Sequence, residues 1–232
     1  MTKILKYTTL LASLSLTAVS AVATSYTESQ PMDPLLAQTQ HLDEATLEKA
    51  LIAFENAHNA GITDSHLLTI IDYSQPSSKP RLWVFDLEND KLLYEELVSH
   101  GRGSGDLHAN KFSNTPESYQ SSLGVFITEE TYHGRNGYSL RLEGLEENFN
   151  HLARDRAIVI HGANYVDPAF VDKHGRLGRS HGCPAVNPAV NKELINTIKG
   201  GSLVFAYYPD QDWLSESEFL QADNDNIEIS KL

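Results

Sequence analysis

The chain contains the sequence Ala157-Ile158-Val159-Ile160-His161-Gly162, in which four apolar residues lead into a histidine and a glycine. A short apolar run that is rich in β-branched residues predicts a strand buried in a sheet. Such a strand would present the imidazole of His161 at the end of a rigid element, as a catalytic base requires. A histidine that only caps a strand is the alternative interpretation, and the rest of the chain has to distinguish the two.

Strand-like segments dominate the chain on both sides of this run. Short apolar stretches predict further strands at 67–72, 82–87, 92–99, 124–128, 138–143 and 202–207. Two segments have helical periodicity and capping residues: 43–60, with Asp43 as N-cap, and a helix that opens at Asn187-Pro188-Ala189 and ends near Ile198. We expect one domain at 41–210, mainly β, with a β-rich core at 65–208 and a few peripheral helices.

The N-terminus has the pattern of a secretory signal peptide. Lys3 and Lys6 precede an uncharged apolar run at 8–22, and Ala21-Val22-Ala23 has the small residues of a cleavage site. The run is too short to span a bilayer comfortably. We therefore expect residues 1–23 to be removed and the mature protein to be exported, to the periplasm or cell-wall space, without a membrane anchor.

The mature chain is expected to be strongly acidic. The formal net charge is -13, and removal of Lys3 and Lys6 makes it more negative. Nucleic acid and anionic membrane surfaces are therefore poor partners, because like charges repel. Polar segments are expected on both sides of the domain, a linker at 24–40 and an acidic tail at 211–232. Nothing in the sequence indicates the oligomeric state.

Cys183 is the only cysteine of the chain. An exported protein with a single thiol cannot form an internal disulfide, so the value of this thiol lies in its reactivity. A thiol attacks as its thiolate and needs a neighbouring base or cation to lower its pKa. Cys183 is therefore the candidate nucleophile, and His161 is the best candidate for the base.

Further candidates lie directly before the thiol, in Gly178-Arg179-Ser180-His181-Gly182-Cys183-Pro184-Ala185-Val186. His181 and Arg179 can place positive charge near the sulfur or near a substrate carboxylate, although Arg179 is equally well explained as a solvated surface charge. Gly182 permits a close backbone approach, and the amide groups around it can form an oxyanion hole. Ser180 joins these residues as a candidate for substrate binding.

The stretch 101–122 shows no apolar periodicity. It contains Gly101-Arg102-Gly103-Ser104-Gly105 and, further on, Phe112-Ser113-Asn114-Thr115-Pro116. A connection of this length without secondary structure inside a compact domain is usually functional. We expect it to line or cover the active site.

This ordered set of motifs resembles the active-site signature of the L,D-transpeptidases, the YkuD-like peptidoglycan cross-linking enzymes. The resemblance rests on His161-Gly162 and Ser180-His181-Gly182-Cys183, extends over about 67–208, and is closest to the murein L,D-transpeptidase catalytic domain proteins. Other matching motifs are Phe112-Ser113-Asn114, Ser121-Ser122-Leu123-Gly124-Val125-Phe126, Tyr138-Ser139-Leu140-Arg141-Leu142 and Arg156-Ala157-Ile158-Val159-Ile160-His161-Gly162.

The resemblance implies a β-rich catalytic domain with Cys183 as nucleophile, His161 as base, the Gly162 carbonyl orienting the imidazole, and His181 within the catalytic motif. It implies a peptidoglycan stem tetrapeptide as donor. The thiolate attacks the L-centred residue before the terminal D-Ala, D-Ala leaves, and an amine acceptor resolves the thioester. The reaction requires no metal or organic cofactor.

Three alternatives stay open. Water in place of the amine would make the protein an L,D-carboxypeptidase or a wall hydrolase. His161, His174, His181 and Cys183 could instead form a zinc site, although close ligand pairs are missing apart from His181 and Cys183. A noncatalytic wall-binding domain needs neither His161 nor Cys183, so the presence of both argues against it.

Overall fold

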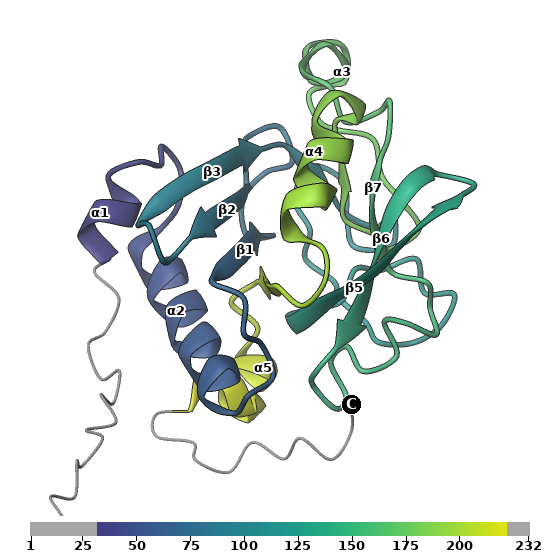
Figure 1. Ribbon diagram of the computed structural model, residues 1–232. Coiled ribbons are helices and arrows are strands. Elements are labelled where there is room, and N and C mark those ends of the chain that lie inside the picture. The colour runs from purple at the N-terminus through teal and green to yellow at the C-terminus, as the bar shows by residue number, and fades with distance from the viewer. Residues whose placement is uncertain (1–31, 222–232) are drawn as a thin grey trace, which may run out of the picture.

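The computed structural model describes residues 32–221. Within these residues, nine strands form one sheet and short helices lie around it, the mainly β fold that the sequence predicts (Figure 1). The strands are β1 (Leu67–Asp72), β2 (Leu82–Asp86), β3 (Lys91–Glu96), β4 (Val98–Ser99), β5 (Gly124–Gly134), β6 (Gly137–Gly144), β7 (Val159–Gly162), β8 (Ala185–Val186) and β9 (Leu203–Tyr207). The helices are α1 (Met32–Leu36), α2 (Glu44–Asn59), α3 (Pro168–His174), α4 (Pro188–Ile198), α5 (Gln211–Glu216) and the 3-10 turn η1 (Glu218–Leu220).

The sheet curls until its two ends meet. Its strand order is β3-β2-β1-β9-β5-β6-β7-β8-β4, so β3 and β4 are the two edges. Along the chain only Leu97 separates these edge strands. Two Cα steps span at most about 7.6 Å, and the two edges must therefore lie next to each other, as in a barrel.

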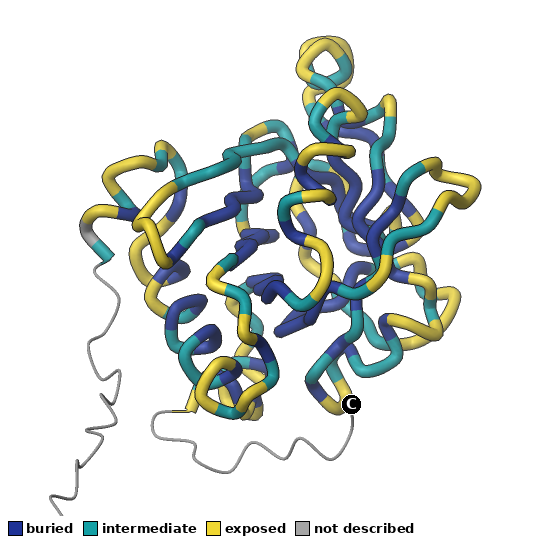
Figure 2. The backbone as a smooth tube through the Cα atoms, in the orientation of Figure 1, coloured by how far each residue is buried: buried dark blue, intermediate teal, exposed yellow. Residues whose placement is uncertain are grey.

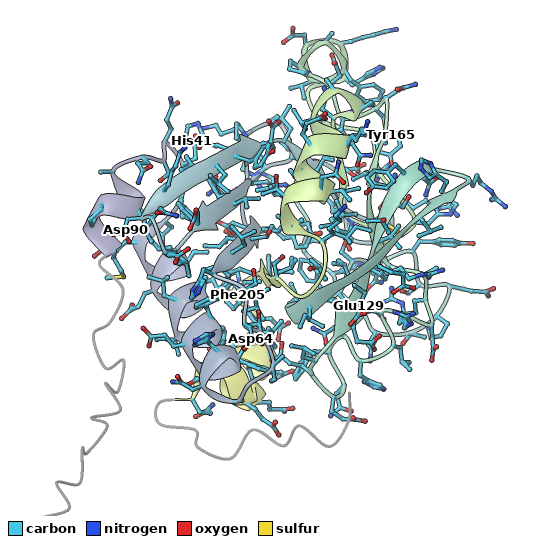
Figure 3. The ribbon with its side chains drawn as sticks, in the orientation of Figure 1. His41, Asp64, Asp90, Glu129, Tyr165 and Phe205 are labelled. Atoms are coloured by element: carbon cyan, nitrogen blue, oxygen red, sulfur yellow. The ribbon has the colours of Figure 1, made fainter. Side chains whose placement is uncertain are left out.

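The last strand joins the two halves of the sheet. β9 pairs in parallel with β1 and antiparallel with β5. Every residue of β9 is buried, and Phe205, labelled near the centre of Figure 3, has no exposed surface. A continuously apolar strand fits this position because the curled sheet and its helices cover it on both faces.

The two long helices begin at the caps that the sequence predicts. The Asp43 carboxylate accepts the Ala45 N–H at 3.0 Å at the start of α2, and the Asn187 side chain accepts the Ala189 N–H at 2.9 Å at the start of α4. In Figure 1, α2 lies beside β1, and α4 lies in front of the sheet. α4 contacts β6 and β7, and thereby supports the strand that carries His161.

Most predicted strands are confirmed to within a few residues, and β5 and β6 are longer than expected. The predicted strand at 92–99 is divided between β3 and β4, and the run at 157–161 becomes a strand only at Val159. Neither β8 nor α3 was predicted. β8 has only two residues. α3 buries none of its side chains and therefore has no apolar stripe. It is mostly exposed, at the top of Figure 2.

Parts of the predicted linker and tail pack against the domain expected at 41–210. In the predicted linker, α1 packs against α2, and Leu35 is fully buried. In the predicted tail, Trp213 of α5 is fully buried, and its indole N–H donates to the Glu146 carboxylate at 3.1 Å. A few large apolar side chains outweigh the polar composition of these segments, because burying each of them stabilises the fold.

The predicted signal peptide, residues 1–23, lies outside the described residues, as do the first part of the linker and the end of the tail. Between residues 32 and 221, no helix has the length and apolar character needed to cross a membrane.

Candidate active site

β7 carries His161 and buries it. His161 lies opposite Ser139 of β6 and, in a parallel pair, opposite Ala185 of β8. The residue is 4% exposed, and its Nδ1 lies 3.0 Å from the Gly162 carbonyl oxygen. A carbonyl oxygen only accepts, so this hydrogen bond places the proton on Nδ1 and leaves Nε2 as the basic nitrogen.

A tight turn presents Cys183 just before β8. The buried Ser180 hydroxyl accepts the Gly182 N–H at 3.0 Å and donates to the Cys183 carbonyl at 2.6 Å. Gly182 has a φ of 128°, and a Cβ at this position would come within 2.9 Å of the Gln120 carbonyl oxygen. Glycine therefore allows the close backbone approach that the sequence suggested, while the Gly182 N–H is engaged by Ser180.

Cys183 lies close to the segment that leads into β7, the strand that carries His161. His161 pairs with Ala185 of β8, which is two residues after Cys183. The thiol donates to the Ala157 carbonyl at 3.5 Å. Ala157 has a φ of 54°, a costly conformation for a residue with a side chain. Strained backbone therefore lies directly against the thiol.

Residues 101–122 form a wall beside this turn, as the sequence predicts. They contain no helix or strand, and Gly101 bridges to Ser180. The Ser121 hydroxyl donates to the Gly182 carbonyl at 2.9 Å and accepts the Gly101 N–H at 3.0 Å. We call residues 101–122 the wall loop.

The other predicted residues contact the wall loop. His181 is exposed, and its ring packs edge-on against Tyr119 at 4.8 Å between centroids. Arg179 donates to the Gly105 carbonyl at 2.9 Å and forms an ion pair with Asp106 at 2.7 Å. Its guanidinium therefore anchors the wall loop.

The structure does not bring the four zinc candidates together. His161 is bonded to the carbonyl of its own strand, His174 packs against Phe170 on α3, and His181 packs against the wall loop near Cys183. In the described part of the chain, no three His, Cys, Asp or Glu side chains are grouped so that they could hold a metal ion.

A family model described as the L,D-transpeptidase catalytic domain matches residues 38–207. This range is well over half of the chain and contains β7, β8 and the turn between them that bears Cys183. The chain belongs to the L,D-transpeptidase catalytic domain family. No curated protein sequence matches it.

Solved structures of L,D-transpeptidases resemble this domain at low identity. An L,D-transpeptidase from Mycobacterium smegmatis is 13% identical over 62% of this chain and 59% of its own, with a TM-score of 0.39. An L,D-transpeptidase (Yku) from Stackebrandtia nassauensis is 15% identical over 76% of this chain and 88% of its own, with a TM-score of 0.37. The helical cell shape determining protein Pgp2 from Campylobacter jejuni is 12% identical, over 69% and 57%, with a TM-score of 0.39. The chain thus spans about three fifths of the length of the mycobacterial protein.

In this L,D-transpeptidase domain, burial sets the resting protonation states. Burial raises the pKa of the Cys183 thiol, and the Val159 N–H and the charge of Arg156 oppose that rise. Burial lowers the pKa of His161, and the bond to the Gly162 carbonyl opposes that fall. The resting pair is therefore a thiol and a neutral imidazole rather than an ion pair.

Arg156 belongs to the site, and the sequence reasoning missed it. Its guanidinium donates to the Ser113 carbonyl and the Ser122 hydroxyl, both at 2.5 Å, and to the Gln120 carbonyl at 2.7 Å. It also donates to the Ser118 hydroxyl at 3.3 Å, and so ties four points of the wall loop to the segment before β7. Its charge favours the Cys183 thiolate. The sequence feature that could have indicated Arg156 is its position directly before the apolar run 157–160. That position predicts that Arg156 lies near β7, but not that it contacts the wall loop.

Two phenols lie near the thiol. Tyr73 comes from the end of β1, and Tyr165, labelled in Figure 3, comes from the segment after β7. The pKa of each is raised to about 12, mainly by burial, and the charge of Cys183 contributes to the rise. Both therefore keep their O–H, and with it a hydrogen-bond donor, at neutral pH.

Proposed function

We propose that this protein is an exported peptidoglycan L,D-transpeptidase that uses Cys183 as its nucleophile. The observation that carries the proposal is the pairing of β7 with β8: His161 lies opposite Ala185, two residues after Cys183, and the thiol donates to the Ala157 carbonyl just before β7. The family match over 38–207 and the neutral imidazole with a basic Nε2 support the same assignment.

The first step forms the acyl-enzyme. His161 Nε2 takes the thiol proton as Cys183 Sγ attacks the carbonyl carbon of the L-centred third residue of a stem tetrapeptide. A carbon–sulfur bond forms, and the amide bond to the terminal D-Ala breaks. The imidazolium returns the proton to the departing amine of D-Ala. Burial favours this order, because a solvent-poor site opposes a standing thiolate and imidazolium.

The second step transfers the acyl group. An amine of a second stem attacks the thioester, its proton passes to His161, and the carbon–sulfur bond breaks to restore the thiol. Water in place of the amine would give an L,D-carboxypeptidase through the same thioester. The acceptor decides between these outcomes.

The neighbouring residues hold the chemistry in place. The Gly162 carbonyl fixes the tautomer of His161, and Ser180 shapes the turn. Because the Gly182 N–H is engaged by Ser180, we assign the oxyanion contact to the Cys183 N–H, with Gly182 allowing the turn. Arg179 anchors the wall loop in this scheme, and does not bind substrate.

Intact mass spectrometry tests the proposal directly. The mature protein and a Cys183→Ala variant are incubated with a tetrapeptide-stem muropeptide and, separately, with a carbapenem. We expect a covalent adduct on the wild type alone, with release of D-Ala and a dimeric muropeptide. An adduct with trimmed monomer only would assign the hydrolase instead, and no adduct from either reagent would refute Cys183 as the nucleophile.

A further inference from the structure

Three side chains from separate segments meet on the surface beside the catalytic turn. The Arg102 guanidinium lies over the face of the Tyr119 ring, 4.0 Å from its centroid, and the His181 ring packs edge-on against the same ring at 4.8 Å. Tyr119 is the one exposed large hydrophobic residue among residues 32–221. We call Arg102, Tyr119 and His181 the surface triad.

The backbone is arranged to bring the triad together. A Cβ on Gly101 would lie 2.3 Å from the Tyr119 carbonyl oxygen, and one on Gly103 would lie 2.5 Å from the Ser118 carbonyl oxygen. Only glycine on both sides of Arg102 lets the two ends of the wall loop approach this closely. Tyr119 itself has a φ of 56°, a strained conformation of the kind that persists where a site requires it.

The triad is fixed to the nucleophile segment. The Arg102 N–H donates to the Ser180 carbonyl at 2.8 Å, and the Gly103 N–H donates to the Tyr119 carbonyl at 2.8 Å. His181 stands two residues before Cys183 in the sequence. The triad is therefore tied to the segment that carries Cys183.

The positive charge of Arg102 has no carboxylate partner in the described part of the chain. Among residues 32–221 Arg102 forms no ion pair, whereas Arg179 and Arg176 pair with Asp106, and Arg154 pairs with Glu130. A guanidinium stacked on an aromatic ring keeps its in-plane N–H donors free, and this fork matches a carboxylate. In a chain of net charge -13, such a cation offers local attraction to an anionic substrate.

We propose that the surface triad binds the terminal carboxylate of the donor stem peptide, with Arg102 as its principal contact. This assignment rests on the proposed function, because a terminal D-Ala carries its carboxylate next to the bond that Cys183 cleaves. Three bonds separate that carboxyl carbon from the scissile carbonyl carbon, a span under about 5 Å. The carboxylate of a bound donor therefore stays close to the segment that holds both His181 and Cys183.

Direct binding tests the triad without catalysis. Calorimetry on the full chain carrying Cys183→Ala compares the stem tetrapeptide with the same peptide ending in a carboxamide. We expect the free acid to bind about tenfold or more tightly, as the loss of a charge-assisted bidentate contact predicts. Adding Arg102→Ala should abolish the difference, and Arg102→Lys should retain part of it, because the charge remains and the fork is lost.

Arg135→Ala is the matched control. Arg135 is exposed in the turn between β5 and β6, at the right of Figure 1. Arg141 of β6 pairs with Val159 of β7. Arg135 is six residues from Arg141, which corresponds to about 20 Å along the hairpin away from β7. This variant should keep the full preference for the free acid, and Tyr119→Phe should keep it too, because the ring face remains.

Equal binding of acid and carboxamide, binding of neither, or a preference that survives Arg102→Ala would overturn the proposal. The proposed function is measured separately, as D-Ala release by the wild type. If Cys183→Ala protein prefers the free acid and the wild type releases no D-Ala, the carboxylate site stands and the transpeptidase assignment fails.

Discussion

The two sides of the active site are held in place by different forces. His161 lies on β7, which pairs with β6 and β8 in the sheet, and Cys183 lies on the turn that leads into β8. The wall loop has no helix or strand, and side chains such as Ser121 and Arg156 hold it. Reactive groups thus stand on a rigid scaffold, whereas the surface that meets the substrate depends on a few polar contacts. Changes on the two sides should therefore differ in kind.

The largest effect is expected on the sheet side. His161→Ala removes the base that accepts the thiol proton, and kcat/KM for D-Ala release should fall by about 10²- to 10⁴-fold. His174→Ala is the control, since His174 is exposed at the end of α3 and should leave the rate unchanged. If His161→Ala were acylated at near the wild-type rate, His161 would not be the base.

Glu146→Gln should change stability and leave the chemistry intact. The buried carboxylate accepts the Val125 N–H at 2.6 Å and the Trp213 indole N–H, and burial raises its pKa to about 7. The folded-state pKa of Glu146 lies above its unfolded value. The stabilisation that protonated Glu146 gives to the folded state is therefore complete below about pH 4.5 and is lost as the pH rises through about 7. The loss is about 3 kcal/mol in the free energy of unfolding.

Denaturant unfolding between pH 4 and 8 measures this dependence. The difference between wild type and Glu146→Gln should shrink or reverse as the pH rises, while D-Ala release at fixed pH stays the same. Parallel stability curves for the two proteins would show that Glu146 does not titrate with folding.

Arg156→Ala should weaken the loop side. It removes four hydrogen bonds to the wall loop and the charge that favours the Cys183 thiolate, and kcat/KM should fall by about 10- to 100-fold. Alkylation by iodoacetamide should shift to higher pH, and amide exchange at 113–122 should accelerate. Arg154→Ala, which removes an exposed ion pair with Glu130, should do neither. Unchanged alkylation and exchange would leave Arg156 without a role in the site.

The smallest effect is expected at Arg179. Its Asp106 partner is 77% exposed, and such surface pairs contribute little, so Arg179→Ala should lower D-Ala release by less than about threefold. Asp106→Asn should match it, because both changes remove the same contact. A tenfold loss in Arg179→Ala alone would favour a substrate contact for Arg179, one of the two interpretations that the sequence left open.

The sequence predicts what periodicity and capping determine. Asp43 and Asn187 mark helix starts, and apolar runs such as 67–72 mark strands, because these signals are local. β8 escaped prediction since its two residues become a strand only by pairing with β7 and β4, which are distant in the sequence. Trp213 escaped because the apolar surface that buries it comes from elsewhere in the fold.

The site divides in the same way. Cys183 and His161 could be proposed as nucleophile and base because their residue types and surrounding motifs point to that chemistry. The contacts of Arg156 could not be predicted, because the sequence does not show that the wall loop folds back against the segment before β7, where Arg156 lies. The hydrogen bond from the Gly182 N–H to the Ser180 hydroxyl depends on the geometry of the turn, which the motif Ser180-His181-Gly182-Cys183 does not specify by itself.

The place of β9 sets the order in which this protein can fold. β9 is the last strand in the chain, yet it lies between β1 and β5, and its partner Leu68 precedes Leu203 by 135 residues. Until residues 203–207 are available, β3-β2-β1 and β5-β6-β7-β8-β4 share no strand-to-strand hydrogen bonds, and closing such a long loop is slow. A chain that emerges N-terminus first therefore cannot complete its sheet until nearly all of it has arrived.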